Sequence, residues 1–180
     1  AKKKEALEAY KKGLMQKIFS QEHRFKREDG TDYPDWANYC LHELYENIPT
    51  NSLSREFLHD HGDFRNLHYG DIHLKYSGIL NINTADLPFA LQTDYKFKEG
   101  SQVETGDVIF ADAAEDYNGI GKAVEIGETD ATATYAGLHT IHLKLKTDKL
   151  TTGFMGYYTQ GYSFRRKVWF IAQGAKVLGI

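Results

Sequence analysis

The feature that most constrains the fold is a helical stripe of apolar residues that stops near residue 20. Apolar side chains recur at spacings of three and four, which places them on one face of a helix from Lys2 to about Gln21. The opposite face is rich in lysine and is expected to be solvated. The stripe consists of Leu7, Tyr10, Leu14 and Ile18.

Turn-forming pairs separate this helix from the rest of the chain. Asp29-Gly30 and Tyr33-Pro34 both favour turns. The sequence therefore predicts a helical arm over residues 1–28 and a globular domain over residues 29–180. Of the 180 residues 41% are hydrophobic, which is enough for one sizeable core.

The helical stripe should pack against something, because an isolated helix of this length is marginal in water. Gly13 weakens it further, by roughly 1 kcal/mol relative to alanine. Two partners are consistent with the pattern: the chain's own domain, or a second helix in a coiled coil, which usually needs more heptads than this arm offers.

Charge is divided unequally between the two parts. Residues 1–27 hold nine Lys and Arg against three Glu, which gives +6, and since the whole chain carries −3 the remainder carries −9. A domain that held DNA by bulk electrostatics alone would be basic. DNA binding by this chain would therefore need local basic patches or the help of a partner.

The domain begins with a short segment and is then rich in strands. Within residues 36–45 we expect Trp36, Leu41 and Leu44 to point inward. Helical spacing returns between residues 152 and 173, with Gly174 placed to end the last helix. The predicted class is α+β, with a twisted mixed sheet and flanking helices. Four stretches with short apolar runs are the predicted strands: Asp71–Tyr76, Val108–Ala111, Gly121–Ile126 and Thr140–Leu145.

Motifs for catalysis are missing or incomplete. The chain has no Asn-Pro-Pro-Tyr-like tetrapeptide of an amino-methyltransferase. The stretch from Gly119 to Ala123 resembles a phosphate loop, but Asp116 stands where the first glycine should be. Asp94-Tyr-Lys96 has the spacing of a metal-dependent nuclease without a paired upstream acid. We predict no catalytic residue and no cofactor in this chain.

Histidines and the single cysteine give no metal site or disulfide either. His59 and His61, with Asp63, lie in a polar stretch where solvated side chains are the usual outcome. His139 and His142 are expected to face opposite sides of a strand. Cys40 is expected to be a buried small apolar residue. We predict no metal ligand. No run of about twenty apolar residues is present, and the expected location is the cytoplasm.

Polar and aromatic residues in the predicted loops and helices are the remaining candidates for function. Arg can bond guanine, Asn and Gln can bond adenine, and Lys can hold phosphates. The alternative is that they are ordinary loop and packing residues. The candidate DNA-binding residues are Arg65, Asn66, His68, Tyr69, Lys75, Tyr117, Asn118, Lys122, Tyr158, Gln160, Arg165 and Arg166.

Several short motifs follow one another along the chain. The arm leads through Lys12-Gly-Leu-Met-Gln-Lys-Ile-Phe19 and Arg24-Phe25 into Tyr33-Pro-Asp-Trp36. Four motifs then follow in the domain: Gly70-Asp71-Ile72, Gly106-Asp107-Val108, Gly119 to Val124, and Gly137-Leu-His139. In their order these motifs resemble the specificity subunit of type I restriction-modification enzymes, where the last four are framework motifs of a target recognition domain.

The resemblance implies a DNA-specificity role in a bacterial or archaeal cell. In the family, two recognition domains are separated by a pair of antiparallel helices, and each domain reads one half of a split target. The implied partners are double-stranded DNA, methyltransferase subunits and a restriction/translocase subunit, which use S-adenosylmethionine, ATP and magnesium. The chain is expected to be a carboxyl-side piece, because it opens in mid-helix and stops at Ile180, before the family's second conserved helical region.

Two alternatives stay open at this point. The chain could be a half-size specificity protein that forms a homodimer through its arm. It could also be a protein-interaction decoy that binds the methyltransferase subunit without DNA affinity, which is consistent with the acidic domain.

Overall fold

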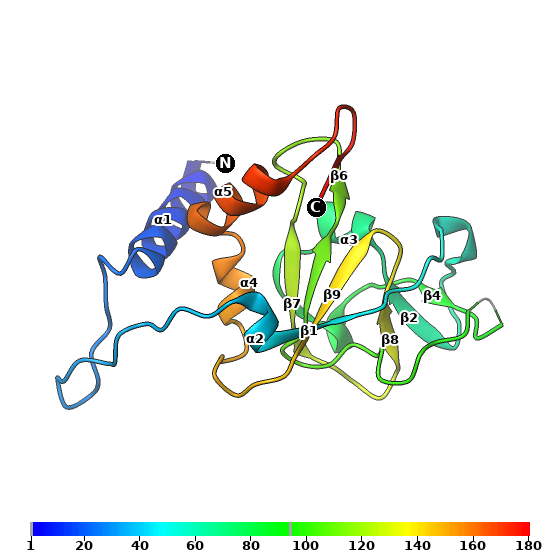
Figure 1. The fold of residues 1–180 in the computed structure, drawn as a ribbon, viewed down its shortest axis with the longest axis horizontal. Coiled ribbons are helices and arrows are strands. Elements are labelled where there is room, and N and C mark those ends of the chain that lie inside the picture. The colour runs from blue at the N-terminus through cyan, green and yellow to red at the C-terminus, as the bar shows by residue number, and fades with distance from the viewer. Residues whose placement is uncertain (1, 94) are drawn as a thin grey trace.

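The computed structural model describes residues 2–93 and 95–180, which form a helical arm beside a mixed α+β domain. The arm helix α1 (Lys2–Phe19) lies to one side of the domain (Figure 1). An extended segment then leads away from the domain and returns to the short helix α2 (Leu41–Leu44). The predicted α+β class, with an N-terminal helix, is confirmed.

The main sheet has five strands in the order β1-β9-β5-β7-β3. Strands β3 and β7 pair in parallel and the other neighbours pair antiparallel, so the sheet is mixed as predicted. The strands are β1 (Tyr45–Ile48), β3 (Gly78–Asn81), β5 (Val108–Ala111), β7 (Ala123–Glu128) and β9 (Thr140–Leu145).

Smaller elements complete the domain. Strands β4 (Phe89–Ala90), β2 (Phe64–Leu67) and β8 (Thr134–Ala136) form a second sheet, and β10 (Leu178–Gly179) pairs with β6 (Ala113–Ala114). The remaining helices are α3 (Tyr69–Leu74), α4 (Phe154–Tyr158) and α5 (Tyr162–Ile171), with single 3₁₀ turns at Arg55–Phe57 and Ile82–Thr84.

Both faces of the main sheet are covered, because alternate residues of its strands enter different clusters. Val108 and Phe110 of β5 pack with Phe164 and Val168 of α5. Their neighbour Ile109 joins the cluster on the other side of the sheet. This alternation follows from the two-residue period of a strand, and it leaves the strand ends to carry loops. Those loops form the site described below.

The arm meets the domain through its carboxyl-terminal half, where Lys11 Nζ also lies 5.5 Å from the centroid of the Tyr157 ring. The Phe19 ring lies 5.4 Å from Tyr158, 5.8 Å from Phe154 and 6.0 Å from Trp36, centroid to centroid. No residue of α1 is buried, and Leu7 and Tyr10 are 58% and 68% exposed. The first half of the predicted stripe is therefore open along this helix.

The predicted strand at Asp71–Tyr76 is wrong, because Asp71–Leu74 belongs to helix α3, and Lys75 and Tyr76 follow the helix end. His68 caps the helix: its Nδ1 accepts a hydrogen bond from the Gly70 amide at 3.1 Å. The His68 amide in turn donates to Asp71 Oδ2 at 3.2 Å. This reciprocal cap satisfies amides that a helix start leaves open, and it outweighs the strand-like alternation of Ile72, Leu74 and Tyr76.

Three predictions of burial near the arm are also wrong. Trp36 and Leu41 are 40% and 41% exposed, and only Leu44 is buried as expected. Cys40 is exposed at the start of α2. Trp36 and Cys40 belong to the segment before α2, which runs along the outside of the domain (Figure 1), and Leu41 is the first residue of α2. Trp36 keeps edge contacts with the rings of Phe19 and Phe154.

Two glycines have other roles than those predicted. Helix α5 ends at Ile171, and Gly174, at φ 139°, lies in the turn that lets Gln173 bond to Gly179. Gly121, at φ 62°, belongs to the turn before β7 rather than to the strand. Among residues 2–93 and 95–180, no helix is long and apolar enough to cross a membrane.

Candidate nucleic-acid interface

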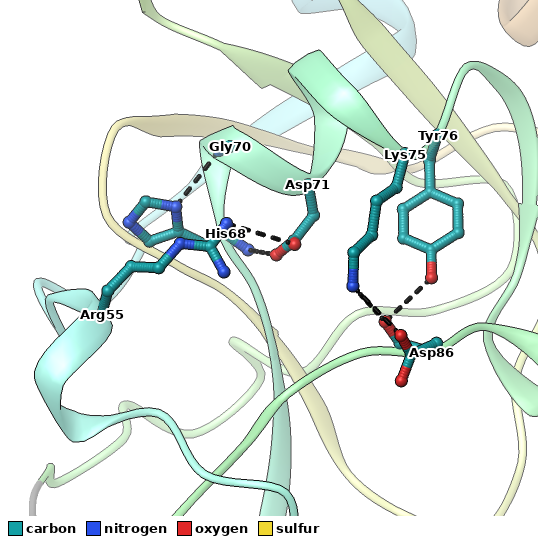
Figure 2. Close-up of polar contacts among 7 residues, drawn as sticks. All are labelled: Arg55, His68, Gly70, Asp71, Lys75, Tyr76 and Asp86. Atoms are coloured by element: carbon teal, nitrogen blue, oxygen red, sulfur yellow. Dashed lines mark hydrogen bonds and ion pairs between the residues drawn. The ribbon is translucent and has the colours of Figure 1, made fainter.

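Helix α3 is held rigidly at both ends by side chains. Figure 2 shows Arg55, His68 and Asp71 converging on its first turn, where Arg55 Nη2 lies 3.3 Å from Asp71 Oδ1. After the helix, Lys75 Nζ lies 3.1 Å from Asp86 Oδ2, and the Tyr76 hydroxyl donates to the Asp86 carbonyl at 2.9 Å (Figure 2). The buried Asp71 anchors the start of α3, whereas the pair of Lys75 and Asp86 beyond its end is exposed.

Two pKa shifts follow from this arrangement. Burial lowers the pKa of His68, and the nearby Arg55 lowers it further. The hydrogen bond from Lys75 to Asp86 raises the pKa of the lysine. His68 is therefore favoured in its neutral form, which can accept the bond from the Gly70 amide, whereas Lys75 stays a cation.

An aromatic cluster surrounds Tyr69 on the first turn of α3. The Tyr69 ring lies 4.4 Å from the His68 ring, 5.8 Å from His73 and 5.4 Å from His139. His73 Nε2 lies 2.9 Å from the Ala113 carbonyl oxygen, and Lys122 Nζ donates to the His73 carbonyl at 3.2 Å. These contacts tie α3 to the loop that joins β6 to β7.

The same loop is tied on its other side to α5. Arg165 Nη2 donates to the carbonyls of Tyr117 and Asn118 at 3.0 and 3.2 Å. Trp169 Nε1 donates to the Tyr117 carbonyl at 2.6 Å. Burial lowers the pKa of Arg165 from its usual value. Tyr117 itself is 54% exposed, so its side chain is presented by an anchored loop.

The loop thus links α3, on one face of the main sheet, to α5, on the other, and we call the residues along this link the recognition face. It presents aromatic rings, an amide and cations together, and such groups can stack on bases, bond base edges and hold phosphates. The recognition face comprises the residues that make these contacts, together with Arg166, which is exposed and follows Arg165 on α5: Tyr69, His73, Tyr117, Asn118, Lys122, His139, Arg165, Trp169 and Arg166.

Six of the candidate DNA-binding residues lie on this face, and sequence reasoning missed three of its members. His139 was considered as a metal ligand and as part of a framework motif, and neither His73 nor Trp169 was among the candidate DNA-binding residues. The missing signal was spatial, because these residues come from α3, from the turn before β9 and from α5. The six are Tyr69, Tyr117, Asn118, Lys122, Arg165 and Arg166.

Three other candidates are committed to contacts within the small sheet and the α3 cap. Arg65 bonds both oxygens of Asp130, at 2.7 and 2.9 Å. Asn66 is fully buried, and its Oδ1 accepts from Asn51 Nδ2 at 2.7 Å. His68 is 4% exposed and caps α3.

The last three candidates lie at the arm junction or in an ion pair. Tyr158 packs on Phe19, and Gln160 Nε2 donates to the Gly156 carbonyl at 2.6 Å. A groove of about 260 Å³ separates Gln160 and Tyr162 from α1. Lys75 is paired with Asp86. These contacts of Tyr158, Gln160 and Lys75 involve no residue of the recognition face.

Residues of the motifs considered for catalysis or metal binding make hydrogen bonds within the fold. In the loop resembling a phosphate loop, the Gly119 amide donates to Asp116 Oδ1 at 2.7 Å. Asp63 Oδ2 accepts from the Gln92 amide at 2.8 Å. Within the described part of the chain, no group of three His, Cys, Asp or Glu could hold a metal ion. Asp94, of the nuclease-like tripeptide, lies outside the described residues.

Comparison with known proteins gives similarity in structure rather than in sequence. No protein-family model and no curated protein matches the chain. One similar solved structure is the type I restriction-modification S subunit from M. genitalium, at a TM-score of 0.46 and 14% identity, covering 81% of this chain and 31% of that one.

A second solved structure is more similar in fold. It comes from work on complex assembly and conformational transition of the type I restriction-modification system. It has a TM-score of 0.53 and 15% identity, and covers 91% of this chain and 36% of that one. The chain thus shares this fold, which confirms the expected resemblance at the level of fold, and it spans about a third of the length of the solved chains it matches.

Proposed function

We propose that this chain is a DNA-specificity module of a type I restriction-modification enzyme, which binds one half-site of a bipartite duplex target. It would carry out no reaction itself. Partner methyltransferase and restriction/translocase subunits, using S-adenosylmethionine, ATP and magnesium, would methylate or cleave the DNA in a bacterial or archaeal cytoplasm. The observation that carries this proposal is the fold shared over 91% of the chain with a component of such a system.

The recognition face suits this role by its chemistry. Asn118 offers an amide that can bond adenine, and Arg166 is an exposed cation that can hold a phosphate. Tyr117 offers a ring on an anchored loop. Since the chain beyond the arm is acidic, we expect partner subunits to supply much of the phosphate neutralisation.

Arg166→Ala is expected to weaken binding of every duplex to a similar degree. In the complex with methyltransferase subunits, the slope of log affinity against log salt should fall in magnitude by about 1, because one phosphate contact is lost. Fluorescence anisotropy over a salt series measures this. The matched control is Lys149→Ala, an exposed cation beyond the other end of β9, which should leave the slope unchanged. If the wild-type complex forms but does not bind DNA, the result would favour the alternative in which the chain is a decoy that binds only the methyltransferase subunit.

A homodimer through the arm is the second candidate, and the open stripe on α1 favours it. Leu7 and Tyr10 are exposed, whereas a stable helix of this length should bury its apolar stripe. A second arm helix would cover these side chains. Molar mass measured by light scattering should then rise with concentration toward that of two chains. Leu7→Lys should abolish this rise, and Lys3→Ala on the same helix should not.

A further inference from the structure

His139 stands out on the recognition face for its backbone. Its φ of 56° lies in the left-handed region, which non-glycine residues seldom adopt. Such conformations persist where the surroundings hold them, and they cluster at sites of function. The side chain is 52% exposed, so burial of the imidazole is not what favours this conformation. The residue is therefore held in an uncommon conformation while much of its ring is open to an external partner.

Two neighbours fix the His139 ring. The Tyr69 ring meets it edge-on, at a centroid distance of 5.4 Å and an interplanar angle of 84°. Asp112 Oδ1 lies 3.3 Å from His139 Nδ1. That oxygen is buried and makes no hydrogen bond among the described residues, so it acts on Nδ1 through its negative charge rather than through a formed hydrogen bond. Asp112 thus favours the tautomer with its proton on Nδ1.

The other ring nitrogen is left to an outside partner. With the proton on Nδ1, a neutral imidazole carries a lone pair on Nε2 and accepts a hydrogen bond there. In the major groove the donors that base edges offer are the amino groups of adenine N6 and cytosine N4. Lys122, which holds His73 on the same face, offers a cation for a nearby phosphate.

We propose that His139 reads one base of the target through its Nε2, which accepts a hydrogen bond from the amino group of adenine or cytosine, and that Asp112 is the positioning residue that sets its tautomer. This inference rests on the proposed DNA-specificity function and deepens it. It assigns base readout to a residue of the turn before β9, whose ring is supported from α3 through Tyr69 and from the end of β5 through Asp112.

The test selects bound duplexes from a randomised DNA library with the complex of this chain and its methyltransferase subunits. His139→Gly removes the imidazole and accepts the positive φ without strain. Base preference at one position should fall about tenfold, the size of one lost base contact, with the melting temperature nearly unchanged. Asp112→Asn can bond either ring tautomer and should relax preference at the same position. The enriched base distinguishes adenine from cytosine. The control is His61→Gly, an exposed histidine of another loop.

The outcomes separate this inference from the proposed function. If the wild type selects a motif and His139→Gly selects the same motif with equal preference at every position, the inference is overturned while the proposed function stands. A lower melting temperature with unchanged preferences would show that His139 serves only its contact with Asp112, which also overturns the inference. If the wild-type complex selects no motif, the proposed function fails and the inference falls with it.

Discussion

Asp107→Ala is expected to lower the free energy of unfolding by about 3–5 kcal/mol, because one buried and two partly buried hydrogen-bonding groups would lose their acceptor. Asp107 is 1% exposed, and its Oδ2 lies 2.7 Å from Nε2 of the fully buried His142. The same carboxylate accepts from the amides of Glu104 and Leu145, at 2.9 and 3.0 Å. Alanine would leave the buried His142 ring and two partly buried amides without this acceptor.

Urea denaturation followed by circular dichroism measures the effect. The matched control is Asp86→Ala, whose carboxylate is 94% exposed in its pair with Lys75 and should contribute little. Asp107→Asn keeps the shape and one acceptor oxygen, so its loss should fall between the two. A loss for Asp107→Ala no larger than that of the Asp86 control would contradict the role assigned to the buried pair.

Glu125→Ala is expected to cost roughly 2–5 kcal/mol, because two buried amides would lose their acceptor. Glu125 lies on β7 and is 2% exposed. Its two oxygens accept from the amides of Gly153 and Gly156, at 2.6 and 2.7 Å, and so hold the start of α4 on the sheet. A Cβ at Gly156 would lie 2.9 Å from the Gly78 carbonyl, so α4 docks where only glycine fits.

The pH dependence of this variant has a definite sign. Burial raises the pKa of Glu125 in the folded protein, although the amides of Gly156 and Gly153 oppose the shift. Between the ordinary pKa and the raised one, the folded state holds the proton that the unfolded state has lost. Stability from this group is therefore greatest at acid pH and declines as pH rises through that window.

The wild-type advantage over Glu125→Ala should accordingly shrink from acid toward neutral pH. Urea midpoints at several pH values for both proteins give the difference, in which other carboxylates cancel. Glu125→Gln resembles the protonated acid, so it should lose less than alanine at neutral pH. A wild-type advantage that grows with pH would contradict the sign.

Elements with a strong local pattern were predictable from the sequence. The stripe of α1 and the apolar run of β9, Thr140–Leu145, depend on periodicity within one segment, and the structure has both. Helix α3 was missed because its start depends on His68 as the N-cap, and the residue type alone does not predict that role. Gly137 of the Gly-Leu-His motif must be glycine because of a tertiary contact, since a Cβ there would lie 2.6 Å from Asn66 Nδ2.

The recognition face was predictable only in part. The exposure of Tyr117 and Asn118 could be predicted, because their loop is polar. Their hydrogen bonds to Arg165 could not, because these bonds join residues at least 47 positions apart in the sequence. The direction of Asn66 was not predictable either, because β2 buries three of its four residues and its pattern does not alternate. Sequence reasoning thus found residue types suited to DNA, and the fold decided which of them share a surface.

The most direct measurement of the DNA-specificity role is adenine methylation in cells. The chain would be expressed with a type I methyltransferase subunit from the same source, and genomic DNA would be sequenced for new methyl marks. We expect methylated adenines in one defined motif, and a split symmetric motif would add evidence for pairing through the arm. A complex that forms but adds no methylation beyond that of the methyltransferase subunit alone would contradict the proposed function.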